Sequence, residues 1–125
     1  MIVKKLSHIC LSTLDLDKVY KFYINELNFK ISHKFINSKN ELYGYFINAG
    51  NNTFLEFFLS KKINRANNNI FRHLCFEVYD LRKVYNKFKK KDPNLKIKIG
   101  KTDRVKQFFV KDFEGNIIEF HERSK

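Results

Sequence analysis

Residues 8–20 read His-Ile-Cys-Leu-Ser-Thr-Leu-Asp-Leu-Asp-Lys-Val-Tyr, and residues 73–85 read His-Leu-Cys-Phe-Glu-Val-Tyr-Asp-Leu-Arg-Lys-Val-Tyr. The two segments align without a gap and share a histidine, a cysteine, an aspartate and the tripeptide Lys-Val-Tyr at equivalent places. Further along each copy, one glutamate interrupts an apolar segment: Glu56 in Phe-Leu-Glu-Phe and Glu119 in Ile-Ile-Glu-Phe. The chain therefore contains an internal repeat with one histidine and one glutamate at matching places in each half.

Both copies predict the same order of elements. In the first half we expect a strand at 3–13, a helix at 16–26 that begins after Asp15, and strands at 29–36, 42–48 and 53–59. In the second half we expect a strand at 72–79, a helix at 81–91 that begins after Asp80, and strands at 95–99, 106–111 and 116–122. The polar residues 60–69 predict a linker between the two halves.

These elements predict an α+β fold. We expect a single domain over residues 1–125, made of two tandem βαβββ modules at about 1–60 and 70–125. Each module has one sheet face covered by its helix and one face open. Two such modules would form a curved mixed sheet around a metal-binding cavity.

The chain is strongly basic, with 25 Lys and Arg against 13 Asp and Glu and a net charge of +12. A nucleic-acid partner is one explanation. However, the basic residues are scattered, and the one dense run, Lys-Phe-Lys-Lys-Lys at 87–91, lies at the end of a predicted helix, where cations suit the helix dipole. The charge therefore favours attraction of a small anionic substrate over nucleic acid as the main partner.

Cysteine content and hydropathy indicate the compartment. The chain has two cysteines and no disulfide-rich pattern, which favours a reducing environment. No segment approaches the ~20 apolar residues of a membrane-spanning helix, and the first residues lack an apolar signal core. We expect a cytoplasmic protein with no membrane partner.

Two histidines and two glutamates are candidate metal ligands. Glu56 and Glu119 alternate with apolar neighbours, so their side chains face away from them. A carboxylate buried without a partner is unfavourable, and a divalent cation would compensate it. A single histidine or glutamate in a strand is more often an ordinary core or surface residue. Matched positions in a repeat instead predict one divalent metal site made of His8, Glu56, His73 and Glu119, with Zn, Ni, Co, Fe or Mn as candidates.

Five other residues fall on the predicted inward face and are candidates for substrate binding: Cys10, Ser12, Cys75, Glu77 and His121. The two cysteines each follow a predicted histidine ligand by two residues. We expect them to line the cavity as small, inert side chains, with a catalytic or ligating thiol as the alternative. For His121 two interpretations stay open, a contact to substrate or ligand and an exposed position near the C-terminus.

These segments together resemble the vicinal oxygen chelate superfamily, which includes glyoxalase I, bleomycin-resistance proteins, fosfomycin-resistance enzymes, methylmalonyl-CoA epimerase and extradiol dioxygenases. The resemblance covers the whole chain. It is most specific at residues 109–120, Phe-Val-Lys-Asp-Phe-Glu-Gly-Asn-Ile-Ile-Glu-Phe. The family typically has an Asp-Pro-Asp/Glu-Gly turn there, before a metal-binding glutamate, and Phe113 stands where proline is usual.

The order His-Glu-His-Glu is similar to that of bacterial glyoxalase I. This resemblance implies a homodimeric lyase with one divalent metal ion, Ni, Zn or Co before Fe or Mn. Its reaction would isomerise a thiol–ketoaldehyde hemithioacetal to a 2-hydroxyacyl thioester through a metal-bound enediolate. Glu119 would be the main catalytic base and Glu56 its counterpart. Ser12 and Ser60 stand where glyoxalase I has the Arg and Asn that hold glutathione, so a glutathione substrate is not supported.

Two alternatives remain at this stage. The chain can be another metalloenzyme of the superfamily, such as an epimerase or a thiol transferase. It can also be a metal-free protein that sequesters a drug or metabolite, as bleomycin-resistance proteins do. The sequence leaves open whether the four ligands come from one chain or from two chains of a dimer.

Overall fold

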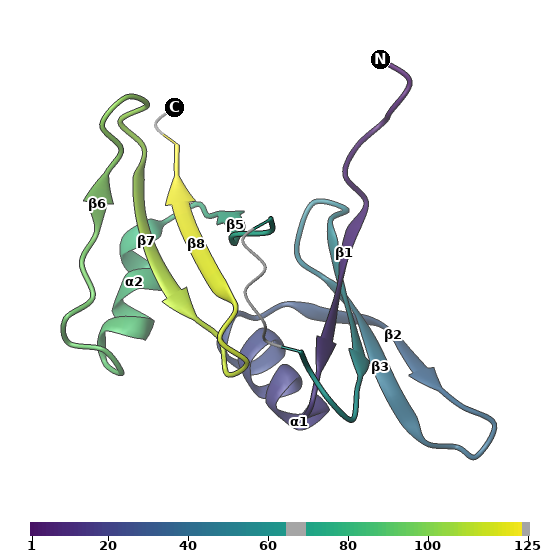
Figure 1. Ribbon diagram of the computed structural model, residues 1–125. Coiled ribbons are helices and arrows are strands. Elements are labelled where there is room, and N and C mark those ends of the chain that lie inside the picture. The colour runs from purple at the N-terminus through teal and green to yellow at the C-terminus, as the bar shows by residue number, and fades with distance from the viewer. Residues whose placement is uncertain (65–69, 124–125) are drawn as a thin grey trace. The chain divides into compact units, whose positions relative to one another are not determined.

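The structure, a computed structural model, describes residues 1–64 and 70–123. The chain divides into two compact units, Met1–Ala66 (unit 1) and Asn67–Lys125 (unit 2), which follow the two copies of the repeat. Each unit has the element order βαβββ and its own four-stranded mixed sheet (Figure 1). The predicted α+β class and the two modules are thus confirmed, whereas the single domain and the cavity stay predictions. The predicted linker lies partly outside the described residues.

Unit 1 contains β1 (His8–Thr13), α1 (Leu16–Val19), a π-helix (Tyr20–Glu26), β2 (Lys30–Ile36), β3 (Leu42–Asn48) and β4 (Phe54–Leu59). The strand order is β1-β4-β3-β2, with β1 parallel to β4 and the other pairs antiparallel. The first strand begins at His8 rather than at residue 3. Its ladder starts at the pair His8 and Phe54, because β4, its partner, itself begins only there.

The helix of unit 1 starts where the sequence predicts and then widens. The Asp15 side chain accepts hydrogen bonds from the backbone N–H groups of Asp17 and Lys18, which caps the first turn. After Val19 the winding changes to π, as in the bond from Leu27 N to Phe22 O at 3.1 Å. The predicted helix at 16–26 is therefore one α-helical turn followed by a π-helical segment.

Unit 2 contains β5 (Leu74–Glu77), α2 (Leu81–Lys89), β6 (Lys98–Ile99), β7 (Lys106–Lys111) and β8 (Ile117–Glu122). The strand order is β5-β8-β7-β6, with β5 parallel to β8 and the other pairs antiparallel. The strand predicted at 72–79 spans only Leu74–Glu77 in the structure, and His73 lies just before it. Of the strand predicted at 95–99, only Lys98–Ile99 is a strand in the structure. The Leu95 carbonyl accepts a hydrogen bond from the Tyr85 hydroxyl at 2.6 Å instead of pairing with a neighbouring strand. No helix within the described part of the chain is long and apolar enough to cross a membrane.

In each unit the helix packs on one sheet face and leaves the other face open. In unit 1 the buried Tyr23 ring lies 4.9 Å from that of Phe57 in β4. In unit 2 the buried Phe88 ring lies 5.6 Å from that of Phe120 in β8. Burial of each such ring contributes about 1.5–3 kcal/mol. Since side chains alternate along a strand, this packing directs Glu56 and Glu119 to the opposite face.

A tight turn sets the register of β8 against β7. The Asp112 carboxylate accepts hydrogen bonds from the backbone N–H groups of Glu114 and Asn116 and from Nδ2 of Asn116, all at 2.9 Å. Gly115 has φ +88°, a conformation that glycine adopts without strain. The turn aligns Lys111 with Ile117, and this register places Phe109 beside Glu119.

Candidate metal site

In unit 1, the strands bring His8 beside Glu56. Glu56 lies in β4 between Cys10 of β1 and Phe46 of β3. His8 Nε2 lies 3.8 Å from Glu56 Oε1. The His8 ring also contacts the ring of Phe46 edge-on, with centroids 5.5 Å apart. The aromatic contact restricts the imidazole to orientations near the carboxylate.

Unit 2 repeats this arrangement. Glu119 lies in β8 between Cys75 of β5 and Phe109 of β7. His73 Nε2 lies 3.0 Å from Glu119 Oε1, and the rings of His73 and Phe109 meet edge-on with centroids again 5.5 Å apart. Each unit therefore pairs its predicted histidine with its predicted glutamate, while metal binding by these pairs stays a prediction.

The two phenylalanines were not among the residues that the sequence singled out. Phe46 and Phe109 each precede the glutamate of their own half by ten residues. The matching spacing was present in the repeat. The role of the rings became apparent only from the antiparallel register, which places each phenylalanine next to its glutamate.

The glutamates differ in exposure. The Glu119 side chain is 11% exposed and the Glu56 side chain 18%, whereas those of the partner histidines are 36% and 41% exposed. A carboxylate withdrawn from water needs compensating partners. In unit 2 two imidazoles provide them, with His73 near Oε1 and His121 near Oε2 at 3.3 Å.

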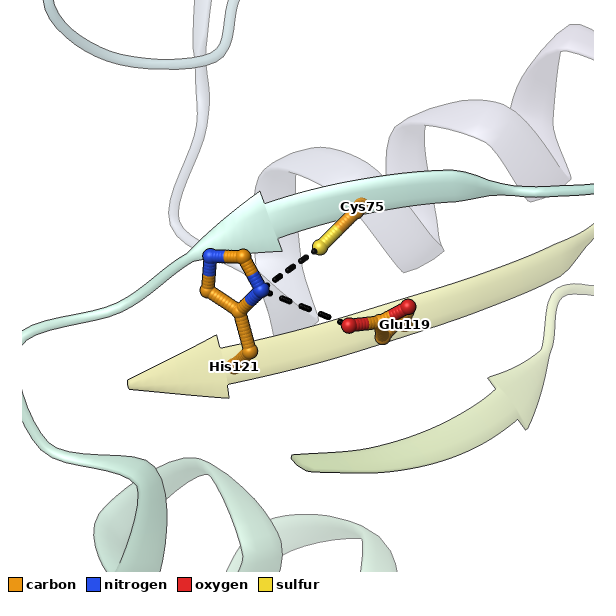
Figure 2. A group of neighbouring side chains, drawn as sticks. All are labelled: Cys75, Glu119 and His121. Carbon is orange, nitrogen blue, oxygen red and sulfur yellow. Dashed lines mark hydrogen bonds and ion pairs between the residues drawn. The ribbon is translucent and has the colours of Figure 1, made fainter. Parts of the chain in front are cut away.

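His121 is half-buried and belongs to this cluster. Figure 2 shows one ring nitrogen of His121 facing both the thiol of Cys75 and the carboxylate of Glu119. Nδ1 lies 3.3 Å from Cys75 Sγ, and Nε2 lies 3.6 Å from Glu77 Oε1. Of the two interpretations left open by the sequence, the structure supports a place beside the candidate ligand rather than an exposed position.

At the matching ladder positions, unit 1 has no equivalent of the Glu77–His121 pair. In the strand register Ser12 pairs with Phe58, where unit 2 pairs Glu77 with His121. The candidate substrate residues Cys10, Ser12, Cys75 and Glu77 are all exposed. The two units thus share the His–Glu pair and the cysteine, and they differ in the residues next to them.

Both thiols are held in the neutral form. Desolvation, followed by the negative charge and hydrogen bonding of Glu119, raises the pKa of Cys75 to about 12. Desolvation and then Glu56 raise the pKa of Cys10. Without a cation, neither cysteine is a thiolate near neutral pH. A bound divalent cation would act in the opposite direction and favour the thiolate.

The donor atoms of both units suit a divalent cation. Imidazole nitrogen with carboxylate oxygen is the usual donor set for Zn, Ni, Co, Fe and Mn in proteins. Glutamates in strand centres and histidines beside them provide this set twice.

Comparison with known proteins finds a family model that matches most of the chain. The family model described as "Glyoxalase/Bleomycin resistance protein/Dioxygenase superfamily" matches residues 5–120. No curated protein sequence shows significant similarity to the chain.

Many solved structures are similar in fold. A glyoxalase family protein from Enterococcus faecalis has a TM-score of 0.73 at 21% identity, with 98% of this chain and 100% of that chain covered. The trypanothione-dependent glyoxalase I of Leishmania major has a TM-score of 0.72 at 22% identity, with coverage of 96% and 87%. A lactoylglutathione lyase from Agrobacterium tumefaciens has a TM-score of 0.71 at 19% identity, with coverage of 98% and 96%. At these identities the likeness shows the fold alone.

Proposed function

Because this chain belongs to the glyoxalase/bleomycin resistance protein/dioxygenase superfamily, we propose that it is a divalent-metal-dependent, glyoxalase I-like lyase. It would transfer a proton on a small oxygenated substrate. The observation that carries the proposal is the duplicated His–Glu pair on the open face of each sheet. The proposed ligands of the single cation are His8, Glu56, His73 and Glu119.

The residues fit such a cation. In each unit an imidazole Nε2 is turned toward a carboxylate Oε1, and the carboxylates are largely withdrawn from water. When bound, a divalent cation would act as a Lewis acid toward substrate oxygens and stabilise negative charge on them. The metal that we expect is Ni, Zn or Co, with Fe or Mn as alternatives.

Glu119 is the proposed general base, and Glu56 its counterpart. Glu119 is the less exposed of the two, and its two oxygens face two different imidazoles, those of His73 and His121. A carboxylate shielded in this way can take the proton from a substrate carbon and return it to the neighbouring atom before water exchanges it. Glu56 has one such imidazole partner, His8.

The thiol portion of the substrate is not assigned to glutathione. Ser12 is exposed, and the Ser60 hydroxyl donates to the backbone oxygen of Lys62 at 2.8 Å. Neither residue supplies the guanidinium or amide that the resemblance would require. The proposed substrate is therefore a small oxygenated compound, and its conjugation to a thiol is to be assigned from a panel of thiols tested for turnover. From the resemblance we also propose that the protein is a homodimer. From its low cysteine content we propose that it is located in the cytoplasm.

A turnover assay with the purified protein tests the proposal. Bound metal is quantified by elemental analysis, and the protein is then supplied with methylglyoxal and each of several thiols while thioester formation is followed by absorbance. The proposal expects stoichiometric metal and turnover that is lost in Glu119→Gln and kept in Glu41→Gln, a change at an exposed glutamate outside the pair. Failure to bind added Ni, Co or Zn would overturn it.

A metal-free binding protein is the second candidate, and one observation favours it. On the open face of unit 1, the ring of Phe46 stacks on that of Phe54 with centroids 4.7 Å apart, next to His8. Such rings suit a flat apolar drug or metabolite. Saturable ligand binding by protein stripped of metal, without turnover, would support this candidate over the enzyme.

A further inference from the structure

Three side chains with metal-binding atoms lie together within unit 2. They are the thiol of Cys75, the carboxylate of Glu119 and the imidazole of His121 (Figure 2). One ligand atom from each lies within 4.8 Å of the other two, a grouping of three found nowhere else in residues 1–64 and 70–123. His121 Nδ1 is 3.3 Å from both Cys75 Sγ and Glu119 Oε2.

These separations approach those of a tetrahedral metal site. With Zn–N and Zn–O bonds of about 2.1 Å and a Zn–S bond of about 2.3 Å, ligand atoms of a tetrahedral site lie roughly 3.4 to 3.6 Å apart. The third pair, Cys75 Sγ and a Glu119 oxygen, lies within 4.8 Å, so rotations that bring these two atoms closer would admit a cation between the three donors. We propose that Cys75, Glu119 and His121 bind a thiophilic divalent cation such as Zn²⁺ without a ligand from unit 1.

A neighbouring carboxylate orients the imidazole for this role. Glu77 Oε1 lies 3.6 Å from His121 Nε2, the ring nitrogen that faces away from the cluster. With a cation bound between Cys75 and Glu119, Nδ1 would be its ligand atom, and Nε2 would keep its proton and direct it at the Glu77 carboxylate. Metal-binding histidines are commonly held by a carboxylate in this way. Arg123 Nε, 3.6 Å from the same oxygen of Glu77, helps to hold that carboxylate in place.

The scaffold of the site is a pair of parallel strands. Cys75 is aligned with Glu119 and Glu77 with His121 in the ladder between β5 and β8. Donors fixed on neighbouring strands are better positioned than donors on loops. All of these residues belong to unit 2, so the site is complete within that unit.

Unit 1 serves as an internal comparison. Cys10 and Glu56 are aligned in the same way, but Phe58 occupies the place of His121 and Ser12 that of Glu77. The third donor and its orienting carboxylate are therefore both missing. The proposal expects no thiolate coordination by Cys10.

The donor set defines which cations are expected. Thiolate with imidazole and carboxylate favours Zn²⁺ and Co²⁺ over the harder Mn²⁺. Binding displaces the thiol proton of Cys75 to solvent, so one proton is released for each cation bound. Three protein ligands leave a fourth position open for water or another ligand. The inference goes beyond the proposed lyase, with which it shares Glu119 alone.

Cobalt spectroscopy of the 125-residue chain tests the inference. Metal-free protein is titrated with Co²⁺, and the near-ultraviolet charge-transfer band between thiolate and cobalt is recorded. We expect the band at one equivalent in the unaltered chain and in Cys10→Ser, and its loss in Cys75→Ser. His121→Phe, which copies unit 1, should weaken Co²⁺ binding at least tenfold. Circular dichroism of each variant is the control for retention of the fold.

The outcomes separate this inference from the proposed function. Absence of the band in the unaltered chain, or its persistence in Cys75→Ser, overturns the inference even if the protein binds metal and turns over substrate. A band that persists in the double variant His8→Ala, Glu56→Gln supports a site confined to unit 2. A band without turnover by any thiol would support the inference and count against the lyase.

Discussion

The imidazole Nε2 of His73 lies 3.0 Å from the Oε1 atom of Glu119, although the two residues come from opposite ends of unit 2. Parallel pairing of β5 with β8 produces this contact, and the pairing of β1 with β4 produces its counterpart in unit 1. Duplication of the contact is the strongest structural support for a shared chemical role. Its consequences can be tested residue by residue.

Replacement of the proposed base should affect turnover more than metal content. Glu119→Gln removes the proton-accepting carboxylate while preserving its shape, and we expect kcat to fall about 10²- to 10⁴-fold. Glu56→Gln should have a smaller effect, because Glu56 is more exposed and faces one imidazole. Steady-state kinetics with matched metal loading measures both. Equal losses in the two variants would contradict the assignment of Glu119 as the main base.

The phenylalanines that contact the histidines should raise metal affinity by holding the imidazole rings in the orientation that binds the metal. The Phe109 ring contacts the His73 ring at a centroid distance of 5.5 Å, and Phe109→Ala removes this contact. Loss of an edge-on aromatic contact is worth about 0.5–1.5 kcal/mol, so we expect metal affinity to fall by up to roughly tenfold. Isothermal titration with Ni²⁺ or Zn²⁺ measures this. Phe71→Ala, at an 87% exposed position, is the matched control and should leave affinity unchanged.

The thiol of Cys75 should react slowly at neutral pH in metal-free protein. Its pKa is raised to about 12, so the reactive thiolate is a small fraction at pH 7. As long as the pH stays below the pKa, that fraction increases about tenfold for each unit by which the pH rises. In a Cys10→Ser protein kept free of metal, the rate of iodoacetamide labelling should therefore keep rising from pH 7 to pH 10. Mass spectrometry follows the labelled fraction. A plateau before pH 9 would show that the thiol is not held neutral in this way.

The turn before β8 should contribute to the stability of unit 2. Asp112→Ala removes three hydrogen bonds to the carboxylate, in a residue that is 6% exposed. At about 1 kcal/mol for each bond, the free energy of unfolding should fall by about 2–3 kcal/mol. Urea denaturation measures the change. Asp92→Ala, which removes one exposed side-chain bond to Asn94 N, should cost clearly less, and equal costs would contradict this account of the turn.

Much of the fold could be predicted because its signals are local. Asp15 and Asp80 cap helices where expected, since a side chain and the N–H groups it accepts from are only a few residues apart. Alternation of apolar residues around Glu56 and Glu119 likewise placed both carboxylates on the face opposite the helix. Strands 42–48 and 106–111 have the predicted bounds.

The sequence alone therefore specified the repeat, the order of elements and the four candidate ligands, because these depend on spacing along the chain. Contacts between strands required the tertiary structure. The register that aligns Cys75 with Glu119 and brings Phe109 and His121 beside them joins residues far apart in sequence. The turn at Asp112 aligns β7 with β8, whereas the parallel pairing of β5 with β8 joins Cys75 and His121, which are 46 residues apart, and no single strand carries a signature of that pairing. For that reason the Cys75–Glu119–His121 cluster emerged from the fold rather than from the repeat.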